Sequence, residues 1–191
     1  MDNRNVWGVT MKSSIEIEFK TLLSESEYNS MIDKFDLSDN IFTQENYYFD
    51  TDDFFIRNNK LGLRIRHKNN TWKVTMKKPC EDYLCEYSII LSEKQAKDYI
   101  ENGFSLKDFG YDLNVKFKAK NVTERAIVSY KNGNLFFDKC TYHGITDYEI
   151  EYEADDSNRG IDDFKNFLKD NKIKYSPSFH KEERAFRALG L

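Results

Sequence analysis

The sequence holds little of what marks disulfide-rich, membrane-spanning or linker-rich proteins. Its three cysteines, Cys80, Cys85 and Cys140, show no metal-ligand spacing, and an odd number is more typical of a reducing compartment than of a disulfide framework. No apolar run reaches membrane-spanning length, and no signal-peptide core begins the chain. Only two prolines and eight glycines are present, which argues against linkers. These absences favour an ordered cytoplasmic protein with no membrane partner.

The motifs of several common catalytic sites are also missing. The histidines, His67, His143 and His180, are scattered and form no Ser-His-Asp or Cys-His arrangement. No GxxxxGK(S/T) loop, which would bind phosphate at a helix N-terminus, is present. The formal net charge is −4 with 32% charged residues, whereas nonspecific nucleic-acid binding is typical of strongly basic surfaces. Nucleic acid is therefore not an expected partner.

The length of 191 residues predicts one domain with a sizeable core, which we place at residues 14–191. Residues 1–13 carry little pattern and are expected to form a flexible leader. Capping boxes, in which a serine and a Glu or Gln three residues later cap each other's backbone, occur at Ser24 with Glu27 and at Ser92 with Gln95. Each predicts the start of a helix. Apolar spacing predicts further helices at about 161–168 and 181–189.

Charged and apolar residues alternate in two segments near opposite ends of the chain. Residues i, i+2 and i+4 of a strand point to the same side. Glu16, Glu18 and Lys20 would therefore share one face of the first strand, and Glu149 and Glu151 one face of the last. Like charges in a row repel one another unless water, cations or opposing charges compensate them. Such strands either face water or line a polar cavity that holds metal ions.

The other expected strands also sort by the sign of their charged face. We predict strands at about 44–49, 61–67, 72–78, 83–91, 122–130 and 135–140, with a type I′ hairpin turn at Asn132-Gly133. Closing such a sheet puts one face inside. The basic candidates for a polar lumen are Lys20, Arg64, Arg66, Lys73, Lys77, Arg125 and Lys181. The acidic candidates are Glu16, Glu18, Glu86, Asp138, Glu149 and Glu151.

The two sets of side chains suit phosphate chemistry. A guanidinium binds phosphate oxygens through paired hydrogen bonds, and an ammonium adds a compact positive charge. Clustered carboxylates bind hard divalent cations such as Mg²⁺ alongside substrate phosphates. Carboxylates alone would repel a phosphate chain, so the two sets make sense together if a metal bridges them. The combination predicts metal-dependent phosphoryl or nucleotidyl transfer.

A set of short motifs runs in order along residues 14–189. It begins with Glu16-x-Glu18-x-Lys20, an ExExK pattern that is a weak signal alone. The rest are Asn46-Tyr47-Tyr48-Phe49-Asp50-Thr51, Leu63-Arg64-Ile65-Arg66, the run from Trp72 to Pro79, Arg125, Asp138, Glu149-Ile150-Glu151 and Ser178-Phe179-His180-Lys181. The ordered set resembles the CYTH superfamily, the triphosphate tunnel metalloenzymes, and most of all their compact bacterial YjbK-like branch.

The resemblance implies an α+β fold, an eight-stranded antiparallel β-barrel with flanking helices. Its tunnel would bind a triphosphate compound with Mg²⁺ or Mn²⁺. By similarity the metal ligands would be Glu16, Glu18, Asp138, Glu149 and Glu151. The phosphate ligands would be Lys20, Arg64, Arg66, Lys77, Arg125 and Lys181, and Lys73 is added because it shares a strand face with Lys77. The residues expected in catalysis are Glu16, Glu18, Lys20, Glu149 and Glu151.

Two positions depart from the family pattern. Leu84-Cys85-Glu86 stands where relatives often carry Arg-Glu-Glu, and Thr123 stands where many carry lysine. Few aromatic residues fall on the expected tunnel faces, so we expect inorganic tripolyphosphate as the substrate, hydrolysed by a metal-activated water. Alternatives within the fold are thiamine triphosphatase, nucleoside or RNA 5′-triphosphatase and class IV-type adenylate cyclase. A non-catalytic polyphosphate or nucleotide sensor is the alternative of another class. A monomer or homodimer is expected.

Overall fold

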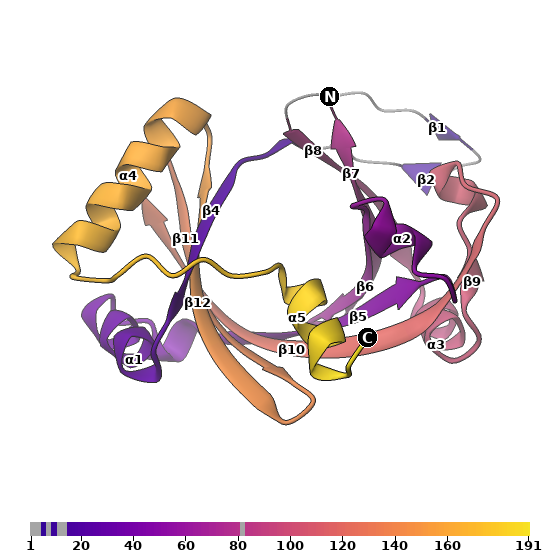
Figure 1. Ribbon diagram of the computed structural model, residues 1–191, viewed down its shortest axis with the longest axis horizontal. Helices are drawn as coiled ribbons and strands as arrows, with labels where there is room; N and C mark the ends of the chain where they lie inside the picture. The colour runs from indigo at the N-terminus through magenta and orange to yellow at the C-terminus, as the bar shows by residue number, and fades with distance from the viewer. Residues whose placement is uncertain (1–4, 7–8, 11–14, 81–82) are drawn as a thin grey trace.

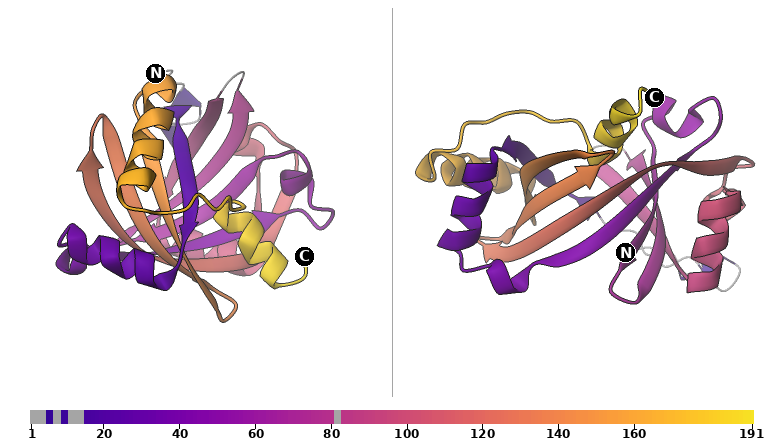
Figure 2. Two further views of the ribbon diagram at one scale, coloured as in Figure 1. Left: turned by 60° about the vertical axis from the view of Figure 1, so that its left-hand side comes forward. Right: turned by 90° about the horizontal axis from the view of Figure 1, so that it is seen from below.

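The computed structural model describes residues 5–6, 9–10, 15–80 and 83–191, and it describes side chains for residues 17–79, 85–156 and 159–191. It is an α+β structure with one large antiparallel sheet, which confirms the predicted fold class. The strands curve around a common centre in the end-on view of Figure 1, and Figure 2 shows the helices around the curved sheet. No helix of the described residues is both long and apolar enough to cross a bilayer.

The strands of the sheet follow one path of antiparallel pairs. Its order is β3-β8-β7-β6-β5-β10-β11-β12-β4, and the short β9 pairs with β10. The bounds are β3 Ile15–Glu16, β4 Glu18–Leu23, β5 Phe42–Asp50, β6 Gly62–Lys68, β7 Thr71–Cys80, β8 Tyr83–Leu91, β9 Phe104–Ser105, β10 Asn114–Tyr130, β11 Gly133–Tyr142 and β12 Ile145–Ala154. Two further strands, β1 (Asn5–Val6) and β2 (Val9–Thr10), pair with each other.

The two ends of this path come from neighbouring residues. β3 pairs with β8, β4 pairs with β12, and only Ile17 separates β3 from β4. This arrangement brings the two charge-alternating segments together, because Glu151 lies opposite Lys20 and Glu153 lies opposite Glu18. Closure of the sheet into an eight-stranded barrel, and the domain limits at 1–13 and 14–191, stay predictions.

The hairpin between β10 and β11 is confirmed, but the predicted position of its turn is wrong by one residue. Tyr130 pairs with Gly133, so Lys131 and Asn132 form the turn. Lys131 has a φ of 54°, and the φ of Gly133 is not positive. Gly133 is required for a close approach instead, because a Cβ there would lie 2.2 Å from the carbonyl oxygen of Glu153.

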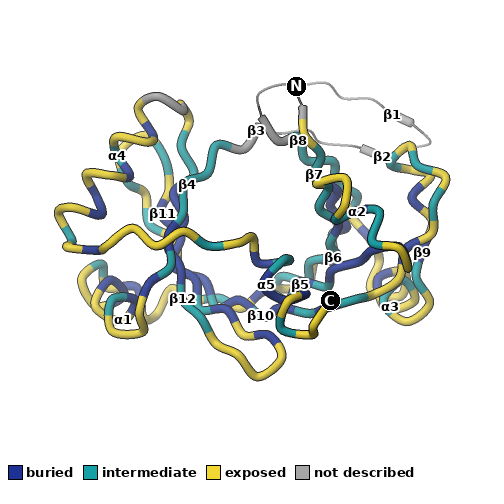
Figure 3. Tube along the Cα trace, in the orientation of Figure 1, coloured by how far each residue is buried: buried dark blue, intermediate teal, exposed yellow. Residues whose placement is uncertain are grey.

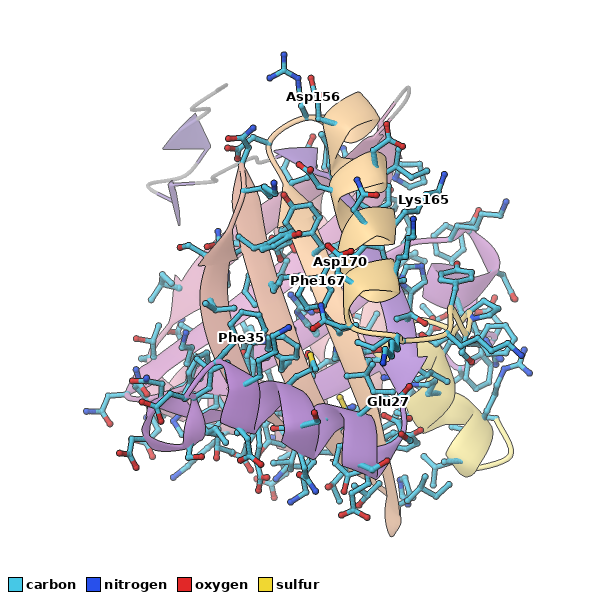
Figure 4. All side chains as sticks on the ribbon, turned by 90° about the vertical axis from the view of Figure 1, so that its left-hand side faces the viewer. Glu27, Phe35, Asp156, Lys165, Phe167 and Asp170 are labelled. Atoms are coloured by element: carbon cyan, nitrogen blue, oxygen red, sulfur yellow. The ribbon has the colours of Figure 1, made fainter. Side chains whose placement is uncertain are left out.

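Helices α1 (Glu25–Lys34) and α4 (Ser157–Asp170) cover part of the outer face of the sheet. Their apolar residues pack around Ile150 and its outward-pointing neighbours. Figure 4 shows Phe35, which ends α1, and Phe167 of α4, whose ring centroids are 6.2 Å apart. The predicted capping box at the start of α1 is confirmed, since Ser24 and Glu27 each accept a hydrogen bond from the other's backbone N–H.

Helices α2 (Phe55–Asn58) and α3 (Glu93–Asn102), with β9, enclose a second apolar cluster. Phe49, Ile65 and Val74 lie within it, and all three alternate along their strands with residues of the charged face. In Figure 3 the buried residues follow the strands, while the helices expose much of their surface. These two apolar clusters are therefore outside the curved sheet, and the charged residues of the strands are on its inner face.

Helix α5 (Lys181–Ala188) packs against the inner face instead. Its Ala185 and Phe186 form a buried cluster with Tyr48, Cys140 and Tyr142, which belong to β5 and β11. Two short 3₁₀ helices, Ser38–Asn40 and Lys107–Phe109, complete the elements. The last helix of the chain thus brings its first residues to the charged face of the sheet.

Candidate active site

A cavity of about 670 Å³ is lined by residues of β4, β5, β6, β7, β10 and β12, by the segments around 57–61 and 179–180, and by α5. Its wall is both basic and acidic. The predicted site residues that line it are Glu18, Lys20, Arg64, Arg66, Lys77, Arg125, Glu151 and Lys181. The structure therefore brings together side chains that the sequence places near both ends of the chain.

Of the remaining predicted residues, Lys73, Asp138 and Glu149 are not among those that line the cavity. Glu16 belongs to β3, and its side chain lies outside the described part of the structure. Asp138 and Glu149 are fully buried. Lys73 belongs to β7 and lies opposite Arg66 of β6. Lys73 is partly buried, and burial lowers its pKa. Their predicted roles stay predictions.

Lys181, the first residue of α5, joins three carboxylates of the sheet. Its Nζ atom lies 2.8 Å from Asp138 Oδ2 and 2.6 Å from Glu151 Oε1, and it also contacts Glu149 Oε1. Asp138 is directly opposite Glu149 in the β11–β12 pair, and Glu151 follows on the same face. Strand register alone therefore gathers the carboxylates, and Lys181 ties the last helix to them.

Arg125 forms the second buried ion pair of this acidic side. Its Nε and Nη2 atoms donate to the two Asp138 oxygens at 2.6 and 2.5 Å, and Nη2 also donates to Glu151 Oε2 at 2.6 Å. Burial would raise the pKa of Asp138, but Lys181 and Arg125 hold it well below its usual range. Burial and the Glu18 carboxylate raise the pKa of Glu151 to about 8. Burial is the larger of these two causes, and Arg125 and Lys20 act against the shift.

Arg184 and Glu153 are site residues that the sequence analysis missed. Nη1 of Arg184 donates to Glu149 Oε2 at 2.6 Å, and its Nε lies 3.1 Å from Asp147 Oδ2. Arg184 comes three residues after Lys181, and this spacing puts both side chains on one face of α5. The spacing could have identified Arg184 from the sequence. Glu153 lines the cavity, and the alternation of charge along β12 pointed to it.

Glu18 and Lys20 form the part of the site contributed by β4. Lys20 Nζ donates to Glu18 Oε1 at 3.0 Å and lies 3.0 Å from His180 Nδ1. Burial opposes ionisation of Glu18, but the ammonium groups of Lys20, Lys181 and Lys77 lower its pKa to about 2. Glu18 is thus a charged carboxylate on the cavity wall.

The basic side of the cavity belongs to β6 and β7. Lys77 Nζ lies 3.1 Å and Arg64 Nη2 3.7 Å from Glu86 Oε1, and Glu86 is opposite Lys77 on β8. Arg66 Nε donates to Asn46 Oδ1 at 2.8 Å. Burial and the guanidinium of Arg64 lower the pKa of Arg66 to about 9. The cavity thus has a basic side and an acidic side.

Residues at the start of α5 also connect the cavity to α2. Glu183 accepts two hydrogen bonds from the Arg57 guanidinium, at 2.8 and 2.7 Å. The buried Asp50 carboxylate accepts the backbone N–H groups of Ile56 and Arg57 at 2.8 and 3.1 Å, which fixes the position of α2. Glu182 lines the cavity, and burial together with Asp50 raises its pKa to about 8.

Two groups of residues could hold a cation. The ligand atoms of Asp138, Cys140 and Glu149 lie within 4.8 Å of one another and are buried, but the cation that contacts both carboxylates here is the ammonium of Lys181. The carboxylates that line the cavity, such as Glu18, form the second group. Oxygen ligands of this kind are those that Mg²⁺ and Mn²⁺ prefer.

The cysteines have different states. Cys140 is a free and fully buried thiol, and burial raises its pKa to about 11, so it carries little thiolate. Cys85 of β8 is disulfide-bonded, which the odd number of cysteines did not lead us to expect. The side chain of Cys80 lies outside the described part.

The CYTH domain family matches residues 14–186 of the chain. The chain therefore belongs to the CYTH family, which confirms the resemblance found in the motifs. A Bacillus subtilis (strain 168) protein named "Putative triphosphatase YjbK" is 34% identical over an alignment of 174 positions, and the match covers 85% of this chain and 90% of that protein.

Solved structures agree with this assignment. A Bacillus halodurans crystal structure, described as that of "a putative adenylate cyclase", has a TM-score of 0.85 and 33% identity, and the match covers 91% of this chain and 98% of that one. A Hippeastrum protein, described as a "putative adenylyl cyclase" that "reveals a dominant" triphosphatase activity, has a TM-score of 0.69 and 21% identity over 92% of this chain and 95% of its own. The second likeness shows the fold alone.

Proposed function

We propose that this protein is a divalent-metal-dependent triphosphatase whose substrate is inorganic tripolyphosphate. One observation carries the proposal: the same cavity is lined by Arg64, Arg66 and Lys77 and by the carboxylates of Glu18 and Glu151. A polyphosphate needs cations, and carboxylates beside it are useful only through a bridging metal ion. The 34% identical relative named "Putative triphosphatase YjbK" supports the same chemistry.

The proposal includes a closed barrel. β3 and β4 are separated only by Ile17 and pair with the two ends of the sheet path. Counted as one strand, they would complete a ring of eight strands. Such a ring would make the cavity a tunnel and would enclose the phosphate chain. A cytoplasmic location and a monomeric or dimeric state stay predictions.

The acidic side suits Mg²⁺ or Mn²⁺. Glu18 and Glu151 would be its ligands on the cavity wall, with Asp138 and Glu149 next to Glu151 and with Glu16 on the same segment as Glu18. Their oxygens are hard ligands of the kind that these cations prefer. Burial and the Glu18 carboxylate raise the pKa of Glu151, and a divalent cation would favour its charged form. A bound metal ion supplies charge neutralisation at phosphate oxygens and lowers the pKa of a coordinated water.

The cations divide into two groups by their partners. Arg64, Arg66, Lys77 and Lys20 would bind the phosphate chain, because they line the cavity, and Lys73 would join them, because it shares a strand face with Lys77. Arg125 and Lys181 are bound to the acidic side chains, so they hold those carboxylates in place, and Arg125 has further N–H groups that it can offer to a phosphate. Fixed donors of this kind stabilise charge on the phosphoryl group as its bond breaks.

A phosphate-release panel tests the proposal. Purified protein is incubated with tripolyphosphate, pyrophosphate, ATP, GTP or thiamine triphosphate, with Mg²⁺, Mn²⁺ or EDTA. We expect tripolyphosphate to be cleaved fastest, to pyrophosphate and phosphate, and EDTA to stop the reaction. Glu18→Gln is the inactive variant. Lys165→Ala, an exposed residue of α4 that Figure 4 labels, is the control and should behave as wild type.

Other outcomes would favour the alternatives. Cyclic AMP as the product from ATP would identify a cyclase. Preference for thiamine triphosphate or a nucleotide would correct the substrate but not the reaction. Tight binding of tripolyphosphate without turnover, with either metal, would overturn the hydrolase and identify a sensor.

A further inference from the structure

Arg66 differs from the other buried cations of the site in the partner that it binds. Arg125 contacts Asp138 and Glu151, and Lys181 contacts three carboxylates. The partner of Arg66 is the carboxamide of Asn46, which is uncharged and fully buried. Asn46 fixes the guanidinium through its Nε–H and adds no negative charge to it. Since Arg66 lines the cavity, its positive charge is available to a ligand.

More carboxamides lie next to Asn46 on the inner face. Asn121 is directly opposite Asn46 in the β5–β10 pair, and Gln44 precedes Asn46 by two residues and so points to the same side. Asn46 and Asn121 are fully buried and Gln44 is 2% exposed. Within the described part of the chain, the side-chain nitrogens of all three have no hydrogen-bond acceptor. Buried donors of this kind are normally paired, and an unpaired one is costly.

The surrounding charges favour an anion at this place. Besides burial, the cations Arg64 and Arg125 lower the pKa of Arg66 to about 9. The pKa of Lys68 is also lowered, by burial and then by Arg66. Arg66, which binds Asn46, thus has the cations Arg64 and Arg125 near it, and the nearby carboxylate that acts on it is Glu86 of β8. An anion bound here would relieve the repulsion and accept hydrogen bonds from the buried amides.

We propose that Arg66 with the carboxamides of Asn46, Asn121 and Gln44, together called the carboxamide subsite, binds one phosphoryl group without a metal ion. The inference rests on the proposed function, because Arg66 lines the same cavity, with the buried carboxamides beside it, and it deepens how the substrate is held. An amide N–H and a guanidinium both donate to phosphate oxygens, so this subsite needs no bridging cation. The two ends of a tripolyphosphate would thus be bound by different chemistry, one by fixed donors and the other through metal-bound carboxylates.

Asn46→Asp tests the carboxamide subsite. Aspartate keeps the size of asparagine and still accepts the hydrogen bond from Arg66, but it replaces the buried donor by a negative charge that pairs with the guanidinium. Titration calorimetry of the full chain with inorganic phosphate, in EDTA, measures the binding. We expect phosphate to bind the wild type and the variant to bind it more weakly by about tenfold or more. Asn134→Asp, the same change at an exposed residue of β11, should leave the affinity unchanged.

Asn121→Leu is a second variant for the case in which a buried aspartate prevents folding, as thermal unfolding would reveal. It removes a donor without adding charge and should also weaken phosphate binding. Absence of phosphate binding by the wild type in EDTA, or unchanged affinity in the folded variants, would overturn the inference. The outcomes for the two proposals differ. If the protein binds phosphate in EDTA but hydrolyses none of the substrates, the carboxamide subsite is supported and the triphosphatase proposal is overturned. If it hydrolyses tripolyphosphate but does not bind phosphate in EDTA, the triphosphatase proposal is supported and the carboxamide subsite is overturned.

Discussion

The Arg125 guanidinium and the Asp138 carboxylate form a buried ion pair across the β10–β11 pair. Two N–H groups of Arg125 donate to the two oxygens of Asp138 at 2.6 and 2.5 Å, and the two residues lie directly opposite each other. Lys181 Nζ adds a contact of 2.8 Å. Removing one partner of a buried pair leaves the other charge uncompensated. The geometry of the acidic side and the stability of the fold therefore depend on the same residues.

Asp138→Asn should strongly destabilise the protein. The change leaves Arg125 and Lys181 with less negative charge in a buried place, and we expect a loss of about 3–5 kcal/mol in the free energy of unfolding, measured by urea denaturation. Asp162→Asn, an exposed position on α4, should change it by less than about 0.5 kcal/mol. A loss at Asp138 no larger than that of the control would mean that the pair contributes little.

Arg64→Ala should chiefly weaken substrate binding. Arg64 lines the cavity, and its nearest ion-pair contact is the long one to Glu86, at 3.7 Å. Loss of a charged donor to phosphate costs about 1.5–3 kcal/mol, so KM for tripolyphosphate should rise about tenfold or more while kcat changes less. Steady-state kinetics measure both, with Lys165→Ala as the control. A fall in kcat at unchanged KM would assign Arg64 to the transition state instead.

Glu149→Gln should abolish turnover and leave tripolyphosphate binding largely intact. Glutamine can keep the hydrogen bond from Arg184, which spans 2.6 Å in the structure, but it lacks the charge that a metal ion and the Lys181 ammonium require. Kinetics and calorimetry on the same variant separate the two effects. Glu101→Gln, at an exposed position of α3, is the matched control. Wild-type rates from the Glu149 variant would exclude it from catalysis.

The pH dependence of stability should report on Glu182. Burial and the Asp50 carboxylate raise its pKa from the usual 4.5 to about 8. Between pH 4.5 and about pH 8, Glu182 therefore keeps its proton in the folded protein and loses it in the unfolded chain. The free energy of unfolding consequently falls as the pH rises through this interval. Glu182→Gln keeps the neutral form and does not titrate.

Urea unfolding at about pH 5 and about pH 8.5 brackets this titration. The wild type should lose stability relative to Glu182→Gln as pH rises. Glu101→Gln should run parallel to the wild type. If the Glu182 variant also runs parallel, its carboxyl group does not carry the shift.

Much of the site was visible in the sequence because strand geometry has a fixed period. Alternation predicted that Glu149 and Glu151 share a charged face with Arg64 and Arg66. The structure places Arg64, Arg66 and Glu151 on the cavity wall. The capping boxes at Ser24 and Ser92 were predictable for the same reason, since they depend only on residues three positions apart.

The rest depends on how distant elements pack. That Lys181 contacts Asp138 follows from the docking of α5 on the inner face, and no local pattern sets that docking. The role of Asn46 depends on its cross-strand neighbour Arg66. The position of the hairpin turn was predicted wrongly because Gly133 was expected to adopt a positive φ. Gly133 is needed instead for the close approach of β11 to β12, and the two strands of the hairpin, β10 and β11, do not show this.

The position of β4 beside β12 has a consequence for biosynthesis. Glu18 emerges from the ribosome long before its cross-strand neighbour Glu153 is translated. Pairings between such distant segments close slowly, because the intervening chain must first lose much of its freedom. A chain that ends before β12 therefore lacks Glu151 and Glu153 of the cavity wall, and recovery of the proposed tripolyphosphate hydrolysis during refolding would time the pairing of β4 with β12.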